Sequence, residues 1–321
     1  MLNEYIELIN RYLTDKYAGH FPENLYDPVS YILKLPGKRI RPVLVMLTAE
    51  GYQVDRQEAL PAAAALEIFH NFTLLHDDIM DDAYVRRGQP TVHRKWDINT
   101  AILSGDAMVY LAQQELEVYP DKTYKRLQQL FNSTALEICE GQQMDMDFEK
   151  YEEVSSEDYM EMIRKKTAVL LGTSMAFGAI VAGQDEKEVS YLQKTGDYIG
   201  IAFQMLDDYL DLFGNSDFGK KTGGDILEKK KTFLYVKALE KLRRPQRDKL
   251  IELYHSFNIP DEEKVYMIKK LYEDFGIDKN VLQEAHHFTD KAISTVDKTK
   301  MNKKQKGILI KLAMDLKNRT K

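Results

Sequence analysis

Residues 59–82 read ALPAAAALEIFHNFTLLHDDIMDD, a long apolar stretch that ends in a run of aspartates. Its apolar residues recur with the period of an α-helix, which predicts one long helix with acidic groups at its carboxyl end. Residues 187–213, KEVSYLQKTGDYIGIAFQMLDDYLDLF, repeat the same design 130 residues later. Long helices of this kind pack side by side as bundles, whose interiors hold metal sites and ligand cavities.

Helical periodicity also dominates the rest of the chain, and alternation of the β-strand type is hard to find. Breaks are expected near Pro36-Gly37, Arg87–Pro90 and Gly219–Gly224. We therefore predict an all-α fold, with residues 1–321 forming a single domain of about ten or more helices around a central apolar cavity. Besides the two segments above, the expected helical segments are 1–17, 43–50, 99–118, 124–148, 157–182, 228–241, 246–257, 261–274, 279–296 and 303–318.

Composition narrows the possible functions. The net charge is −6, from 45 basic and 51 acidic residues, which disfavours a nucleic-acid partner. Cys139 is the only cysteine, so no internal disulfide is possible and a reducing compartment is expected. The most apolar stretch, residues 168–183, is too short to span a bilayer. We therefore expect a cytoplasmic protein without a transmembrane segment.

The two acidic clusters predict a metal site. Residues four apart on a helix lie only about 40° apart around its axis, so the first and last carboxylates of each cluster share a face. Aspartate at a carboxyl end opposes the helix dipole, which makes a purely structural role a poor explanation. Facing carboxylates need divalent cations, and Mg²⁺ in turn invites phosphate oxygens. The residues concerned are Asp77, Asp81, Asp207, Asp208 and Asp211.

Several basic segments accompany the clusters. Arg86-Arg87-Gly88 places two guanidinium groups on a turn directly after the first cluster, where forked hydrogen bonds can hold a phosphate. A lysine-rich loop follows the second cluster and includes Lys220 and Lys230. Further basic groups occur at Gly37–Pro42 and at Lys165-Lys166-Thr167. The sequence thus contains both a predicted metal site and separate basic groups. This combination predicts two anionic substrates, one bound through metals and the other bound directly by Lys and Arg.

Six motifs in this order resemble the trans-isoprenyl diphosphate synthase (polyprenyl synthetase) family. They are GKRIRP, HNFTLLHDDIMDDAYVRRGQPTVH, EGQQMDMD, KKTAVL, FQMLDDYLD and GKKTGGDILEKKKT. The resemblance implies the isoprenoid synthase fold, a homodimer, and head-to-tail condensation of isopentenyl diphosphate with an allylic diphosphate of 5 to 15 carbons. It is closest to the short-chain members, which make farnesyl (C15) or geranylgeranyl (C20) diphosphate.

The same resemblance implies roles for individual residues. Asp77 and Asp81 would bind two Mg²⁺ ions and Asp207 a third, with Asp208 and Asp211 assisting through water. The matched positions for the allylic diphosphate are Arg86, Lys166, Thr167, Gln204, Lys220 and Lys230. Those for isopentenyl diphosphate are Gly37, Lys38, Arg41, His70 and Arg87. The catalytic set is Asp77, Asp81, Arg86, Lys166, Thr167, Gln204 and Asp207. Gln142 and Asp145 match a supporting polar motif, while Pro36, Ala83 and Leu234 depart from the family pattern.

Product length is expected to depend on the residues below Asp77. The family pattern points to Thr73 and Phe72, the fourth and fifth residues upstream. Thr73 lies about 40° from Asp77 around an ideal helix, but Phe72 lies about 140° away. Geometry alone thus leaves open whether Phe72 forms a cavity floor or belongs to the ordinary core.

Three alternatives remain on the sequence. A longer-chain polyprenyl diphosphate synthase would share the motifs. A class I terpene cyclase also uses DDxxD, but it typically lacks both a second DDxxD and a GKRIRP-type site. A non-catalytic partner subunit usually has degraded aspartate motifs, whereas both motifs are intact here.

Overall fold

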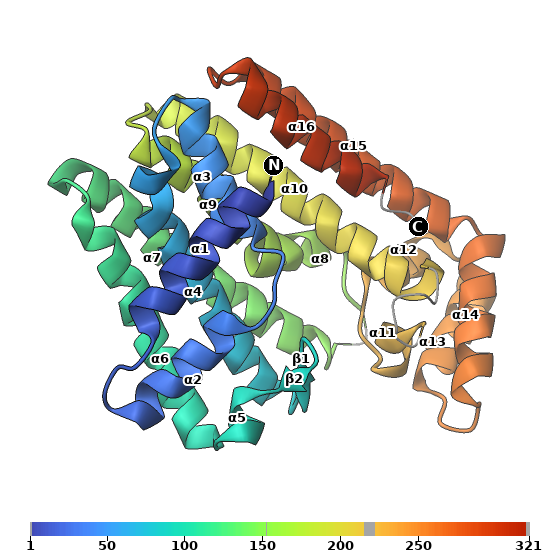
Figure 1. Ribbon diagram of the computed structural model, residues 1–321. Coiled ribbons are helices and arrows are strands. Elements are labelled where there is room, and N and C mark those ends of the chain that lie inside the picture. Colours follow the sequence, from blue (N-terminus) through green and yellow to red (C-terminus); the bar gives the residue numbers. More distant parts are fainter. Residues whose placement is uncertain (1, 152, 215–221, 319–321) are drawn as a thin grey trace. The chain divides into compact units, whose positions relative to one another are not determined.

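The computed structural model describes residues 2–151, 153–214 and 222–318, and helices dominate throughout (Figure 1). In chain order the elements are α1 (Leu2–Tyr17), α2 (Glu23–Lys34), α3 (Ile40–Gly51), α4 (Arg56–Met80), β1 (Val85–Arg86), β2 (Gln89–Pro90), α5 (Val92–Lys95), α6 (Ile98–Gln114), η1 (Glu115–Val118), α7 (Asp121–Phe148), α8 (Ser156–Ile163), η2 (Arg164–Ala168), α9 (Val169–Val181), α10 (Glu186–Phe213), α11 (Gly224–Leu227), α12 (Phe233–Lys241), α13 (Arg244–His255), α14 (Asp261–Asp274), α15 (Ile277–Lys298) and α16 (Lys303–Lys317). The predicted all-α fold is confirmed. Within the described ranges, strand structure is limited to the antiparallel pair β1–β2.

The long helix predicted over residues 59–82 is α4. It starts at Arg56 because the Asp55 carboxylate caps it, accepting a hydrogen bond from the Gln57 N–H at 2.8 Å. Two other predictions were wrong, one of a helix start and one of a whole helix. The helix expected over 228–241 begins only at Phe233, where Thr232 acts as the cap. The helix α2 was missed altogether, and it carries Pro28 inside it.

The described residues divide into two compact units. The first unit comprises residues 2–132, 173–192 and 300–305, and the second comprises the described residues of 133–172, 193–299 and 306–318. That the chain forms a single domain stays a prediction.

The first unit is built around α4, which packs against α3 and α6. Four consecutive alanines, Ala62–Ala65, are fully buried on α4, and such small side chains allow neighbouring helices to approach closely. Gly178 serves the same purpose for α9. A Cβ at Gly178 would lie 2.3 Å from the Val45 carbonyl oxygen of α3. The amino-terminal half of α4 and the α3–α9 contact are therefore tightly packed.

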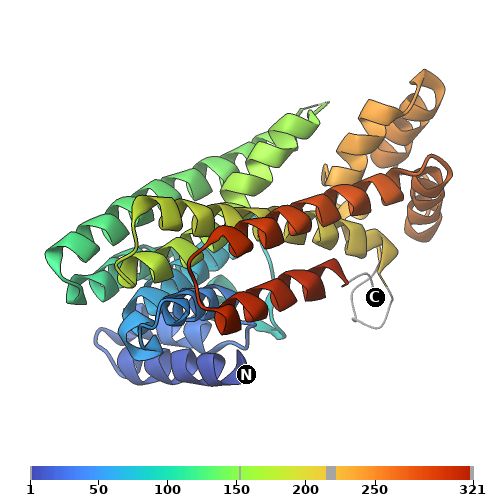
Figure 2. The same ribbon diagram turned by 90° about the horizontal axis from the view of Figure 1, so that it is seen from above.

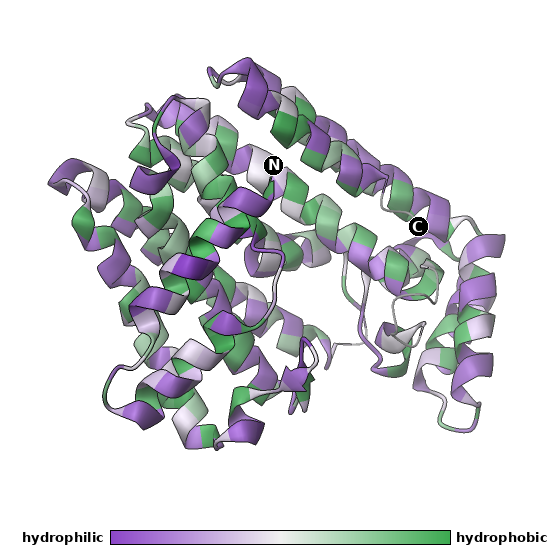
Figure 3. Cartoon of the chain, viewed as in Figure 1, coloured by the Kyte–Doolittle hydropathy of each residue, from purple (hydrophilic) through white to green (hydrophobic). Residues whose placement is uncertain are grey.

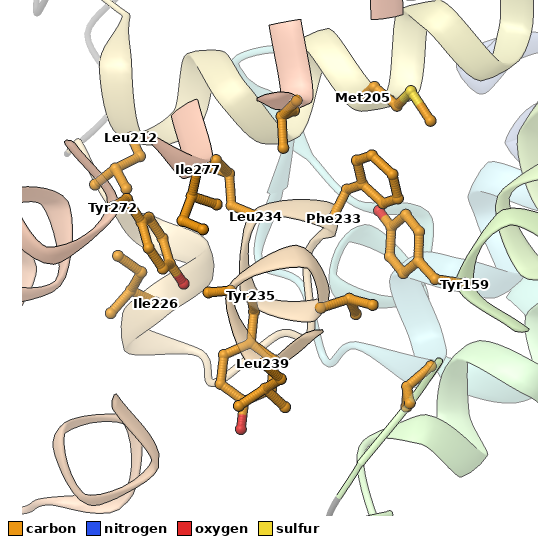
Figure 4. Close-up of a cluster of buried hydrophobic side chains, with 14 of the residues drawn as sticks. Tyr159, Met205, Leu212, Ile226, Phe233, Leu234, Tyr235, Leu239, Tyr272 and Ile277 are labelled. Carbon is orange, nitrogen blue, oxygen red and sulfur yellow. The ribbon is translucent and has the colours of Figure 1, made fainter. Parts of the chain in front are cut away.

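The core of the second unit is rich in aromatic residues (Figure 4). Tyr235 packs on Tyr254 with ring centroids 4.3 Å apart, and the Tyr254 and Tyr272 hydroxyls lie 3.3 Å from each other. Tyr159 stacks on Phe233 with a centroid distance of 5.5 Å. Leu234, which replaces the proline common in the family, is buried among these residues. The substitution therefore preserves an apolar core position.

The end of the chain forms two neighbouring helices, α15 and α16 (Figure 2). An ion pair joins them, since Lys317 Nζ lies 2.7 Å from Asp290 Oδ1. On α15 the buried residues recur every three or four positions, and hydrophilic and hydrophobic residues alternate along its ribbon (Figure 3). No helix in the described part of the chain combines the length and hydropathy that a membrane crossing requires.

Candidate active site

The first acidic cluster lies at the carboxyl end of α4, in the first unit. Asp82 adopts a left-handed conformation (φ 49°), and the Ala83 N–H bonds back to the Asp78 carbonyl at 2.9 Å, which ends the helix. Asp81 is exposed and Asp77 is half-buried. The two predicted metal ligands therefore lie one turn apart at a solvent-accessible helix end.

Asp78, between these ligands, is buried and pairs with Arg86. Arg86 Nε lies 2.8 Å from both carboxylate oxygens of Asp78, and Nη2 lies 2.7 Å from Oδ1. Forked pairs of this kind fix the guanidinium plane. Nε–H and one Nη2–H face Asp78, so Arg86 retains three of its five N–H donors for a second anion.

Arg87 lies at a tight turn between β1 and β2. Arg87 and Gly88 both have positive φ angles (53° and 78°), as a two-residue type I′ hairpin requires. A left-handed arginine costs about 1 kcal/mol. Its guanidinium reaches Gly37, where an added Cβ would lie 2.8 Å from Arg87 Nη1. The structure thus brings together Gly37 and Arg87, two residues that the family resemblance assigned to one ligand.

Arg41, next to His70, adds a second guanidinium group near Arg87 in the first unit. Arg41 Nη1 lies 3.0 Å from His70 Nε2. Burial, together with the nearby charges of Arg41 and Arg87, lowers the pKa of His70 well below its ordinary value. Burial also lowers the pKa of Arg41 to about 10, with Arg87 adding to the effect and Glu67 opposing it. Such crowding of cationic groups creates a potential that an anionic ligand relieves.

Arg39, in the middle of the GKRIRP motif, has a structural role and differs in this from the proposed ligand-binding residues around it. It is buried, and it donates to the Glu67 carboxylate and to the Leu33 carbonyl, each at 2.5 Å. Lys38 beside it is exposed. The motif therefore alternates a structural arginine with residues that are accessible to a ligand.

The residues expected to set product length, Phe72 and Thr73, lie five and four residues before Asp77. Phe72 is half-buried in a column of rings on α4, with centroids 5.4 Å from Phe69 and 4.7 Å from His76. Thr73, also half-buried, bonds the His70 carbonyl through its hydroxyl at 2.8 Å. Their role in chain length stays a prediction.

The second acidic cluster lies at the carboxyl end of α10, in the second unit. Asp207 is exposed and Asp211 is half-buried, but Asp208 is buried. Asp208 accepts hydrogen bonds from Gln204 Nε2 at 3.0 Å, from the Phe233 N–H at 2.8 Å and from the Tyr159 hydroxyl. Burial raises its pKa to about 6, although these donors act in the opposite direction. This is the environment of a structural carboxylate. The water-mediated metal role expected of Asp208 stays a prediction.

A π-helical turn, η2, presents Lys166 and Thr167 in the second unit. Lys166 Nζ lies 2.5 Å from Asp145 Oδ2, and Thr167 Oγ1 lies 3.2 Å from Gln204 Oε1. Gly141 allows this approach, because a Cβ there would come within 2.4 Å of the Lys166 backbone nitrogen. π-Helical turns inside α-helices frequently mark functional sites.

Asp225 is a candidate active-site residue that was not predicted from the sequence. Its N–H donates to Asp211 Oδ2 at 3.1 Å, and Lys230 Nζ lies 3.9 Å from its Oδ1. Burial raises the pKa of Asp225 to about 7, and the charges of Asp211 and Asp208 add to the rise. The available signal was its place directly after Gly223-Gly224, beside the lysine-rich loop. Lys220, assigned to the same loop, lies outside the described residues.

Comparisons with known proteins identify the family of the chain. Residues 22–275 match the model of the polyprenyl synthetase family. The chain belongs to this family. It is 40% identical to a geranylgeranyl pyrophosphate synthase of Geoglobus acetivorans, with 87% of this chain and 86% of that protein aligned. A crystal structure of a geranylgeranyl pyrophosphate synthase superposes with a TM-score of 0.95 at 43% identity and covers 99% of each chain.

A further polyprenyl synthetase neighbour was crystallised with ligands. It is the geranylgeranyl pyrophosphate synthase of Corynebacterium glutamicum, in complex with isoprenyl diphosphate and magnesium. It is 26% identical and has a TM-score of 0.86, with 99% of each chain covered. The present chain is thus a prenyltransferase that makes a short-chain isoprenyl diphosphate, as the motifs predicted.

Proposed function

We propose that this polyprenyl synthetase condenses isopentenyl diphosphate with allylic diphosphates of 5 to 15 carbons and that geranylgeranyl diphosphate (C20) is its end product. The observation that supports this proposal is the presence of two kinds of groups that can bind a diphosphate, directly or through metal ions. Guanidinium groups gather around His70 with Gly37 beside them, whereas the carboxylates occupy the ends of α4 and α10. The similarity to geranylgeranyl pyrophosphate synthases at about 40% identity supports the C20 product.

The two substrates are assigned to different residues. Isopentenyl diphosphate keeps its diphosphate in the reaction, so it needs cations that hold an anion without a metal. Arg41 and Arg87 meet this need, with Lys38 beside them, and His70 and the Gly37 backbone can add uncharged hydrogen bonds. The allylic diphosphate leaves during the reaction, and charge builds up on it. For that substrate we propose Arg86, Lys166, Thr167, Gln204, Lys220 and Lys230.

The exposed carboxylates at the two helix ends suit Mg²⁺. Asp81 and Asp207 are accessible to solvent. Mg²⁺ is commonly bound by one or two carboxylates together with the phosphate oxygens of the substrate, and it is seldom enclosed by protein ligands alone. We propose three ions, held by Asp77, Asp81 and Asp207 with help from Asp211. When bound, they would neutralise the charge that develops on the leaving diphosphate.

The test is incubation with labelled isopentenyl diphosphate, Mg²⁺ and one primer of 5, 10 or 15 carbons, followed by chain-length analysis. Each primer is expected to yield the C20 product, and Asp77→Asn is expected to lose nearly all turnover while retaining its helix content. The absence of condensation would refute the proposed activity, and a C15 or longer product would refute the assigned length. Hydrocarbon or alcohol formed from an allylic substrate alone would indicate a cyclase instead.

We further propose that the enzyme is a cytoplasmic homodimer that associates through an apolar surface of α6. This α6 surface consists of Ile98, Ile102, Leu103 and Tyr110, whose exposed fractions range from 42% to 68%. Large exposed apolar patches are typical of protein interfaces. Ile102→Glu should shift the sedimentation of the enzyme from dimer to monomer. The control is Tyr266→Glu on α14, which places the same charge at an exposed apolar residue (63% exposed, against 42% for Ile102) outside the α6 surface.

A further inference from the structure

Asp208 of α10 links three helices of the second unit, and one of its partners, Gln204, is a proposed substrate-binding residue. It accepts the Gln204 amide from within its own helix α10 at 3.0 Å. It also accepts the Phe233 N–H, in the first turn of α12, at 2.8 Å, and the Tyr159 hydroxyl of α8. Gln204 in turn contacts Thr167 of η2. The carboxylate is buried, whereas its neighbour Asp207 is exposed.

The chemistry of these groups determines the direction of their hydrogen bonds. A carboxylate only accepts hydrogen bonds, so the NH₂ group of Gln204 has to face Asp208. The amide oxygen of Gln204 then faces Thr167 Oγ1 at 3.2 Å, and because that oxygen also only accepts, Thr167 must donate. With its proton engaged in this way, the Thr167 hydroxyl can offer a substrate only its lone pairs. Lone pairs favour positive charge of the kind that develops on an allylic carbon.

We propose that Asp208 is a positioning residue, and not a metal ligand, which orients the Gln204 amide and thereby the Thr167 hydroxyl toward the allylic substrate. The inference rests on the proposed prenyl transfer and deepens it. The first unit contains a parallel: Asp78, the second aspartate of the other cluster, is also buried and holds Arg86 through a forked pair. In both clusters the second carboxylate therefore contacts protein groups, while the first remains accessible or half-buried.

The decisive variant is Asp208→Asn, which keeps the size of the side chain and changes its hydrogen bonding. The Asn carbonyl can still accept from Phe233 and Tyr159, but its NH₂ group would then meet the NH₂ group of Gln204. To avoid this clash of two donors, the Gln204 amide has to flip. Its NH₂ group then faces Thr167, and the Thr167 hydroxyl becomes the acceptor. We expect kcat to fall by about 10- to 100-fold, the range typical of a misoriented catalytic group. The KM for the allylic substrate and the Mg²⁺ concentration for half-maximal activity should stay within about twofold of wild type.

Asp207→Asn is the matched control, because it makes the same change at the exposed neighbour. We expect it to raise the Mg²⁺ requirement and to weaken Mg²⁺-dependent binding of a non-ionising thiolodiphosphate analogue of the primer, measured by calorimetry. Asp208→Asn should leave that binding within about twofold of wild type. A shift in Mg²⁺ dependence as large as that of Asp207→Asn would overturn the positioning role.

A double-mutant cycle tests whether Asp208 acts through Thr167. In the Thr167→Val background, Asp208→Asn should cost little more activity, because the group that it orients is already gone. Multiplicative losses would overturn the inference. Should Asp208→Asn fail to fold, Gln204→Met replaces it in the cycle, with the same expectation. If the wild-type enzyme is inactive in prenyl transfer, both the proposed function and this inference are refuted. If the wild type is active but the two losses multiply, the inference alone is refuted.

Discussion

Asp197 is a carboxyl group whose ionised form is unfavourable in the folded protein. It lies on α10 in the second unit, and its Oδ1 is buried without a hydrogen-bond partner among the described residues. A Cβ at Gly172 would lie only 2.1 Å from this oxygen, so the backbone of the neighbouring helix presses on it. Burial raises the pKa of Asp197 from 3.8 to about 7, with Glu137 adding to the rise and Arg164 opposing it.

The stability effect follows from proton linkage. Between the unfolded and folded pKa values, the folded state holds a proton that the unfolded state has lost, so stability falls as pH rises. Roughly three units at 1.36 kcal/mol each give an upper limit of about 4 kcal/mol. Because Asp197 is half-buried and partly screened by solvent, we expect about 2 kcal/mol above pH 7. The cost is absent below pH 4.

Asp197→Asn removes the titration while keeping the shape of the side chain. We expect the variant to be more stable than wild type at pH 8 and the difference to shrink as pH falls toward 5. Urea denaturation followed by circular dichroism, at one protein concentration and at pH 5.0, 6.5 and 8.0, measures this difference. A difference that does not change with pH, or that grows toward acid, would refute the assigned cause.

Asp185 provides the control with the opposite sign. This exposed residue accepts the Glu188 N–H at 2.9 Å at the start of α10, and that hydrogen bond is the largest influence lowering its pKa. Its stabilisation is present above the unfolded pKa and is lost as pH falls through the folded value. Asp185→Asn should therefore be less stable than wild type at neutral pH, with a difference that closes in acid.

Three further outcomes are expected. Gly37→Ala places a methyl group 2.8 Å from Arg87 Nη1, so the KM for isopentenyl diphosphate should rise about tenfold while the KM for the allylic substrate holds; equal changes in both would argue against the assignment. Phe72→Ala should lengthen the product seen by chromatography, whereas the volume-conserving Phe72→Met should not, and unchanged products in both would place Phe72 in the ordinary core. Gly141→Ala forces a methyl group against the Lys166 backbone and should lower the free energy of unfolding by about 1–3 kcal/mol; a neutral result in denaturation would mean that the two backbones can separate.

Several features followed directly from the sequence because they depend on local chemistry. Helical periodicity located α4 and α10 to within a few residues, and the four-residue spacing of Asp77 and Asp81 placed both at one helix end. The missed helix α2 shows the limit of this reasoning, since Pro28 within it reads as a break until packing compensates. The late start of α12 is a second limit of this reasoning. The helix begins only after Thr232, whose side chain accepts a hydrogen bond from the Tyr235 N–H.

What the sequence by itself determined was the helical class, the family and the residue types that the chemistry requires, since these follow from periodicity, spacing and charge. Only the tertiary structure decided which of those residues face protein. Asp207 and Asp208 are adjacent in the chain and identical in type, yet one is exposed and the other is buried beneath Tyr159 and the start of α12. Burial depends on which distant segments pack against a helix face, and no local pattern encodes that.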